Sequence, residues 1–305
     1  MRTNLWNKEE ERKFFTKTLE IASPEQLFYL TKDGRYVAYW PRDYRGKKST
    51  LQSRNAFIGS YTEKWIKDLL TPFARKRGLY AIHNVVCREI GLTRLSPADV
   101  ALVKTPQQEQ KPEDITLLVE VKMSIVWNWE YIPSTGKLIC IGDYTTHQGT
   151  PGLLRSDSML KAIGKSINIR VSGPYASGIP IIVIGNTPIK KSYYKKVDFL
   201  KKAGIIQGFY SLNPNPLDED NQDNIKRTPF EGFMRIDSLK ELHKKLKNLV
   251  ENKMFFFSSM LPKRELGKII EEASKEPTDE LKGEKFLKLL TEIKNEQAKK
   301  RYKNQ

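Results

Sequence analysis

The sequence is poor in cysteine and histidine, with two Cys and three His among 305 residues. Two cysteines cannot form a disulfide framework, and neither a CxxC pair nor a His/Cys cluster with zinc spacing is present. These absences exclude structural zinc, haem and iron–sulfur clusters. No apolar run approaches the roughly 18 residues of a membrane helix, and Met1 to Lys13 lacks the apolar core of a secretory signal. We therefore expect a cytoplasmic protein with no membrane partner.

Acidic residues are also few relative to basic ones. The chain has 36 Asp plus Glu against 53 Lys plus Arg, which gives a formal net charge of +17. This excess favours a polyanionic partner such as DNA, RNA or an anionic membrane surface. Any single lysine cluster is equally well explained as a solvated helix face. We expect the C-terminal run Lys299–Lys303 to form a frayed basic tail that attracts phosphate without specificity.

The order of the expected elements predicts an α/β protein with a mixed central sheet flanked by helices. These elements are a helix over 7–20, a hairpin over 27–40, a helix over 55–71, strands over 79–88, 98–104 and 115–123, a Gly/Pro/Thr-rich passage over 131–152, a helix from about 156, a strand over 179–185, a helix over 192–203, a strand over 205–212, and helices over 237–252, 263–274 and 279–298. The dipeptide Asp33-Gly34 suits the turn of the hairpin.

Composition divides the chain further. Residues 1–54 form an accessory segment of helix and hairpin, and 55–212 contain the α/β core. The polar run 213–228, with two Pro and several Asp and Asn, predicts a loop or linker, and 229–305 predict a helical C-terminal segment.

Two neighbouring β-rich runs carry acids. In an antiparallel hairpin with Lys104 opposite Ile115, counting inward places Asp99 opposite Glu120. Lys122 lies on the same face because strand side chains alternate with a period of two. A register slip of one residue would separate them. The pattern predicts two carboxylates and one lysine converging on an apolar sheet.

This trio suits the hydrolysis of a phosphodiester. Mg²⁺ binds oxygen ligands and prefers one or two carboxylates together with phosphate and water. A lysine beside the ion can orient a water and neutralise charge that develops on a phosphate. The alternative is a surface strand with a Glu120–Lys122 ion pair and an unrelated Asp99.

Glu63 is a third candidate acid. It lies in the helix over 55–71, on a stripe with Gly59, Ile66 and Leu70. A carboxylate between apolar neighbours needs a polar partner. The alternative is a glutamate at the edge of the apolar face that reaches water.

A helix glutamate, then a strand, Pro97-Ala98-Asp99 and Glu120-Val121-Lys122 together resemble the PD-(D/E)xK nuclease superfamily, most closely type II restriction endonucleases. The resemblance covers about residues 55–212, and Pro97-Ala98-Asp99 departs from a strict Pro-Asp pair. It implies a restriction-endonuclease-like mixed sheet of about five strands and dependence on Mg²⁺. It also implies that Asp99, Glu120 and Lys122 are catalytic, that Asp99 and Glu120 hold the metal, and that Glu63 is an accessory metal ligand.

The helix that begins near residue 156 is the candidate DNA-binding element. We expect Met159, Leu160, Ile163 and Ile167 to form its core stripe. The polar candidates for contact with DNA are then Arg155, Ser158, Lys161 and Lys165, with both lysines on one outer face. A helix N-terminus favours phosphate, and Arg155 could read a guanine edge. The alternative is an N-cap followed by a solvated lysine pair.

The sequence thus predicts a Mg²⁺-dependent, sequence-specific endonuclease for double-stranded DNA, similar to type II restriction enzymes. Such a system would include a cognate DNA methyltransferase without a stable complex, and a two-fold symmetric DNA site would suit a homodimer. Two alternatives stay open: a DNA repair or junction nuclease of the same fold, and a catalytically inert nucleic-acid-binding protein.

Overall fold

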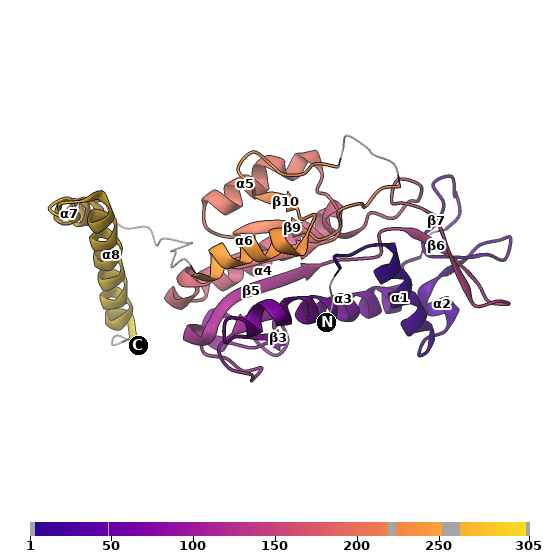
Figure 1. The fold of residues 1–305 in the computed structure, drawn as a ribbon, viewed down its shortest axis with the longest axis horizontal. Helices are drawn as coiled ribbons and strands as arrows, with labels where there is room; N and C mark the ends of the chain where they lie inside the picture. The colour runs from indigo at the N-terminus through magenta and orange to yellow at the C-terminus, as the bar shows by residue number, and fades with distance from the viewer. Residues whose placement is uncertain (1–3, 48, 219–223, 252–262, 303–305) are drawn as a thin grey trace. The chain divides into compact units, whose positions relative to one another are not determined.

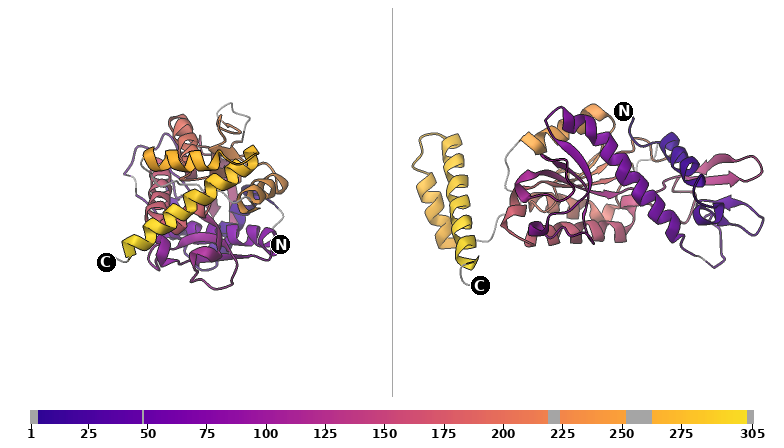
Figure 2. Two further views of the ribbon diagram at one scale, coloured as in Figure 1. Left: turned by 90° about the vertical axis from the view of Figure 1, so that its left-hand side faces the viewer. Right: turned by 90° about the horizontal axis from the view of Figure 1, so that it is seen from below.

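The computed structural model describes residues 4–47, 49–218, 224–251 and 263–302 (Figure 1). The chain divides into two compact units, Met1–Phe256 and Phe257–Gln305. The described part of the second unit consists of helices α7 (Lys263–Ala273) and α8 (Asp279–Tyr302), which pack against each other (Figure 2). The run predicted as a basic tail begins at the end of α8, and residues 303–305 lie outside the described residues. Across the described ranges, no helix has both the length and the apolar character needed to cross a membrane.

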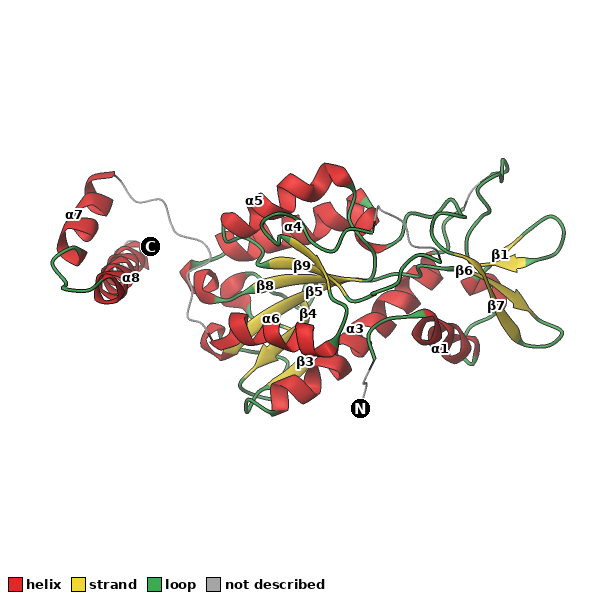
Figure 3. Cartoon of the chain, turned by 45° about the horizontal axis from the view of Figure 1, so that its top comes forward, coloured by secondary structure: helices red, strands yellow, loops and turns green. Residues whose placement is uncertain are grey.

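A six-stranded mixed sheet forms the centre of the first unit, in the order β10-β9-β8-β5-β4-β3 (Figure 3). Its antiparallel half contains β3 (Tyr80–Val85), β4 (Ala98–Val103) and β5 (Ile115–Lys122). Its parallel half adds β8 (Ile181–Gly185), β9 (Gly208–Ser211) and β10 (Phe233–Arg235) to β5. The mixed α/β architecture is therefore confirmed, with one strand more than the expected five. The extra strand is β10, which follows the polar run 213–228 and pairs with β9.

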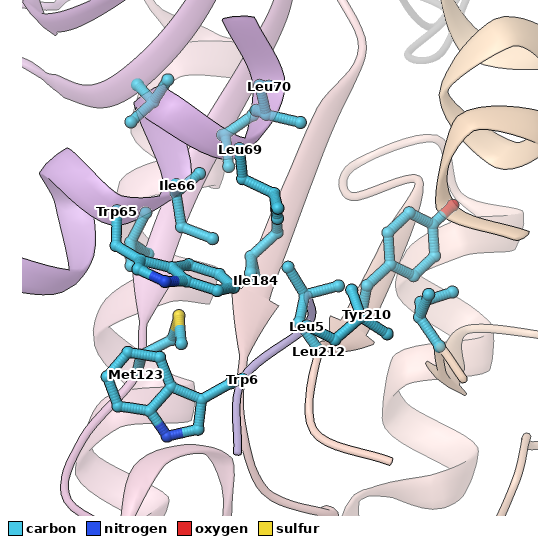
Figure 4. Packing of buried hydrophobic residues seen from close by; sticks show 14 of the residues in the cluster. Leu5, Trp6, Trp65, Ile66, Leu69, Leu70, Met123, Ile184, Tyr210 and Leu212 are labelled. Atoms are coloured by element: carbon cyan, nitrogen blue, oxygen red, sulfur yellow. The ribbon is translucent and has the colours of Figure 1, made fainter. Parts of the chain in front are cut away.

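Helices cover both faces of this sheet. On one face lie α3 (Gln52–Arg75) and α6 (Leu239–Glu251), whose buried apolar side chains join those of β4, β5 and β8. Figure 4 shows Trp65, Ile66 and Leu69 of α3 in this cluster with Ile184 of β8. On the other face lie α4 (Ser156–Val171) and α5 (Tyr194–Lys202). The central strands are apolar on both faces because both faces are covered.

A second, four-stranded antiparallel sheet has the order β1-β2-β6-β7. The hairpin β1 (Tyr29–Leu30) and β2 (Tyr36–Val37) is confirmed, and Gly34 in its turn adopts a φ of +81°. It pairs with a hairpin of β6 (Asn128–Ile132) and β7 (Lys137–Gly142). This second hairpin differs from the expectation, because Gly, Pro and Thr in the passage over 131–152 are typical of loops.

Two N-terminal helices, α1 (Lys8–Leu19) and α2 (Pro24–Leu27), precede the second sheet in the chain. The buried Glu11 of α1 accepts backbone N–H bonds from Val126 (2.8 Å) and Trp127 (2.9 Å), in the segment that leads from β5 to β6. It also accepts the indole N–H of Trp129 at 2.9 Å. The N-terminal helix α1 is thereby fixed to the segment between β5 and β6 and to the start of β6.

Candidate active site

The pairing of β4 with β5 brings the predicted acids together. Val100 pairs with Val119 and Ala101 with Leu118, and the same offset sets Asp99 level with Glu120. A backbone N–H bond supports this alignment, since Val121 donates to Asp99 Oδ2 at 2.7 Å. Near the connecting loop the predicted register is wrong by one residue, because an irregularity after Leu102 pairs Val103 with Ile115. The slip lies at the far end of the hairpin and leaves the acids in place.

Four side chains form a closed ionic cluster, Asp99, Glu120, Lys122 and Lys165. Lys122 Nζ lies 2.5 Å from Glu120 Oε1 and 3.6 Å from Asp99 Oδ2. Lys165 Nζ lies 3.0 Å from Asp99 Oδ1 and 2.6 Å from Glu120 Oε2. The side chains are largely buried, with 9% to 19% of their surface exposed. The predicted trio therefore converges, and a second lysine joins it.

The position of Lys165 shows that α4 is turned differently from the expectation. The sequence predicts Lys165 on an outer face and a core stripe that includes Leu160 and Ile167. In the structure these two side chains are 60% and 41% exposed. Met159 of the predicted stripe is buried, and the other buried positions are Ala162, Ser166, Ile169 and Arg170. Because Lys165 lies three and four residues from Ala162 and Ile169, the helix turns it toward the sheet.

The charges in the cluster affect one another strongly. Burial raises the pKa of Glu120, and the neighbouring Asp99 raises it further, whereas the two lysines act in the opposite direction. Burial acts to lower the pKa of Lys165, but the charges of Asp99 and Glu120 outweigh it, and the pKa of Lys165 is raised. Lys165 therefore stays protonated and offsets the repulsion between two close carboxylates.

Glu63 does not join this cluster. Its carboxylate Oε2 lies 2.7 Å from Nε2 of His83 on β3. It also comes from α3, which covers one face of the sheet, whereas Asp99 and Glu120 contact Lys165 of α4 on the other. The expectation that Glu63 assists Asp99 and Glu120 as a metal ligand is therefore corrected. The partner that its apolar surroundings required is His83, which the sequence analysis did not single out.

The remaining DNA-binding candidates lie at the start of α4. Arg155 and Lys161 are exposed, and both pair with Asp157, at 3.3 Å and 3.2 Å. Ser158 is half-buried. These contacts agree with the alternative of solvated side chains around a helix N-terminus, and they leave any contact with DNA as a prediction.

The donor set of the cluster fits a hard divalent cation. A single ammonium group, Lys165 Nζ, contacts an oxygen of Asp99 and an oxygen of Glu120 at once, so one cation can bridge the two carboxylates. Nowhere in the described ranges do three or more His, Cys, Asp or Glu side chains gather in a way that could hold a metal. Mg²⁺ does not need such a group, since it commonly binds one or two carboxylates and completes its shell with water and phosphate.

Comparisons with known proteins identified no relative. A scan against protein-family models, a search of curated proteins and a search of solved structures each returned no match.

Proposed function

We propose that this protein is a Mg²⁺-dependent endonuclease that hydrolyses phosphodiester bonds in double-stranded DNA. The observation that supports this most is the pair Asp99 and Glu120, close enough for one cation to bridge them, beside Lys122. The +17 net charge supports a polyanionic substrate. On this proposal, the mixed sheet belongs to the restriction-endonuclease-like class, and Asp99, Glu120 and Lys122 are the three residues of the PD-(D/E)xK pattern.

Each residue has a distinct task in this reaction. Asp99 and Glu120 would hold Mg²⁺, which supplies Lewis-acid activation of a phosphodiester and of a water when bound. Val121 N–H fixes Asp99 through the bond to Oδ2, so this carboxylate is oriented before a cation binds. Lys122 Nζ lies between the two carboxylates, where it can orient the attacking water and stabilise negative charge on the phosphate.

Lys165 has a different role, which is to keep the two carboxylates close to each other before substrate binds. Its ammonium pairs with both carboxylates and neutralises them where a metal would otherwise be needed. The same observation supports the second candidate function, an inert nucleic-acid-binding protein, in which two lysines balance two carboxylates permanently. Cleavage assays separate these two candidates.

The test uses supercoiled plasmid DNA with Mg²⁺, and with EDTA as the metal-free control. The wild-type protein should produce discrete fragments, whereas a smear would indicate a nuclease without sequence specificity. Glu120→Gln and Asp99→Asn keep the side-chain shapes and should lower the cleavage rate about a thousandfold, equivalent to about 4 kcal/mol in the barrier. Glu113→Gln, at an exposed glutamate outside the cluster, is the matched control and should cut normally.

Two results would contradict the nuclease proposal. One is a wild-type protein that binds DNA but leaves it intact over a range of salt, temperature and DNA sequence. The other is a folded Glu120→Gln protein that cuts at nearly the wild-type rate. Discrete fragments would also favour restriction over repair, because a restriction enzyme cleaves at fixed sequences that its partner methyltransferase protects.

A further inference from the structure

A surface pocket of about 510 Å³ lies between three segments that are far apart in the sequence. Its walls include Arg42 and Arg45 after β2, the loop 144–151 after β7, and Lys190 after β8. All three cations are exposed, and none of the described residues that line the pocket is acidic. The pocket is therefore polar and basic.

The three cations also lack acidic partners among the residues that the structure describes. Within the described residues, no carboxylate forms an ion pair with Arg42, Arg45 or Lys190. Other basic residues differ: Arg35, for example, pairs with Glu130 at 2.7 Å. Unpaired positive charges around one concave surface create a local field that attracts anions.

The walls are held in place before any ligand binds. Arg42 Nη1 donates to the carbonyl of Thr145 at 2.6 Å. Gln148 Nε2 donates to the carbonyls of Tyr44 at 2.7 Å and Arg42 at 3.1 Å. Behind them, Tyr44 stacks on Trp40 with ring centroids 4.0 Å apart. The loop after β2 and the loop after β7 therefore form one connected wall.

Two short chains of contacts connect the pocket with the strand that carries Lys122. Lys122, at the end of β5, is the cross-strand partner of Gly185 on β8. Leu153 packs directly on Gly185, where an added Cβ would lie 2.5 Å from Leu153 Cγ. The next residue, Leu154, lines the pocket. A second link is the bond from Gly152 N–H to Ser124 Oγ at 2.7 Å, two residues after Lys122.

We propose that this pocket, through Arg42, Arg45 and Lys190, binds backbone phosphates of the nucleic acid next to the bond that is cleaved. The inference rests on the proposed nuclease function and adds a binding site to it. Arginine and lysine are the side chains that recognise phosphate through charge-assisted hydrogen bonds. A long phosphodiester chain whose cleaved bond lies at Asp99 and Glu120 can extend past Lys122 and reach the pocket. We expect this contact to contribute affinity and to carry no sequence information.

The test measures binding separately from cleavage. A fluorescein-labelled 30-base-pair DNA is titrated in EDTA, and its anisotropy is followed at several salt concentrations with the wild-type protein and the triple variant Arg42→Gln/Arg45→Gln/Lys190→Gln. If each cation contacts one phosphate, the slope of log K against log[salt] should decrease in magnitude by about 2.7. The matched control, Lys17→Gln/Lys64→Gln/Lys202→Gln, removes the same charge from exposed lysines on α1, α3 and α5.

The control should keep a slope within about one of the wild-type value, because its lysines lie outside the pocket. Equal losses of slope in both triple variants would contradict the proposal that the pocket binds phosphates, since the effect would then reflect net charge alone. An unchanged slope in the pocket variant would overturn it too. Arg45→Glu alone should weaken binding in the same direction, and it serves as a second variant if the triple variant does not fold.

The same proteins distinguish a failure of the pocket from a failure of the nuclease. Cleavage that depends on Glu120, with normal binding by the pocket variant, would reject the pocket and keep the nuclease. Binding that depends on the pocket, without cleavage, would support the phosphate site and reject the nuclease. If a single-stranded RNA of equal charge binds more tightly than the duplex, the proposed duplex DNA occupant is wrong.

Discussion

Replacing Lys165 by Met tests how far the ionic cluster depends on its second lysine. Met has a similar length and no charge, so the substitution removes the ammonium that lies 3.0 Å from Asp99 Oδ1 and 2.6 Å from Glu120 Oε2. Removing one partner of a buried ion pair costs about 3–5 kcal/mol, because the other charge stays buried without compensation. Lys122 still contacts both carboxylates. We therefore expect a loss near the lower end, about 3 kcal/mol in the free energy of unfolding.

The assay is urea unfolding at pH 7.5 in EDTA, followed by tryptophan fluorescence. Lys161→Met is the matched control on the same helix, since the Lys161 side chain is 71% exposed and pairs with Asp157 on the surface. It should change the free energy of unfolding by no more than about 0.5 kcal/mol. A Lys165→Met protein within that same margin of wild type would refute the reasoning, because the bridging ammonium would then contribute nothing.

Two further measurements sharpen this test. In a double-mutant cycle with Glu120→Gln, the loss in the free energy of unfolding caused by Lys165→Met should be smaller by about 2 kcal/mol. The reason is that Glu120→Gln removes the buried carboxylate charge that Lys165→Met leaves without a partner. Mg²⁺ should also stabilise Lys165→Met more than wild type, since an ammonium no longer competes for the two carboxylates. At ten times its dissociation constant, a bound ion adds about 1.4 kcal/mol.

Three other outcomes follow from the structure. Lys122→Met should abolish cleavage while the protein still binds duplex DNA, which separates a role in catalysis from a role in affinity when the two are measured in parallel. Burial lowers the pKa of His147, in the loop after β7, to about 4. Its effect on the free energy of unfolding should therefore be absent above the pKa of an unfolded His, about 6.5, and up to about 3 kcal/mol of stability should be lost as pH falls toward 4. His147→Gln should remove this part of the pH dependence in urea titrations at pH 4 to 8, and parallel curves for the two proteins would contradict it. Glu11→Gln should cost about 3 kcal/mol in the same assay, because an amide nitrogen would face N–H groups of Val126, Trp127 or Trp129, whereas the exposed Glu9→Gln should be neutral.

The placement of Asp99, Glu120 and Lys122 could be predicted because it depends on local rules. Strand side chains alternate with a period of two, and a hairpin of known register then fixes which residues face each other. The register error at Ile115 does not affect the predicted placement of the acids, since the irregularity lies at the loop end of the hairpin and the acids lie at the other end. The α/β class was equally accessible, because continuous apolar strands between amphipathic helices have few ways to bury both faces.

Tertiary structure determined which face of a helix packs against the sheet. The apolar residues of α4 allow two different stripes, and the one with Leu160 and Ile167 looks stronger by hydrophobicity alone. The sheet selects the stripe with Ala162 and Ser166, whose small side chains let the helix approach, and this choice turns Lys165 inward. The partner of Glu63 was hidden for a similar reason, since His83 comes from another element and periodicity within one helix carries no information about it.

The basic pocket could not be predicted from the sequence either, because the residues that line it are far apart in the chain. Arg42, the loop 144–151 and Lys190 are separated by about a hundred residues of chain and then by about forty, and each alone is an ordinary polar loop. The pairing of β2 with β6 and of β5 with β8 brings these loops together. The sequence by itself therefore determined the acids, the lysine of their strand and the class of fold, because these follow from local periodicity. The inward lysine, the partner of Glu63 and the pocket depend on contacts between distant elements, which only the folded chain creates.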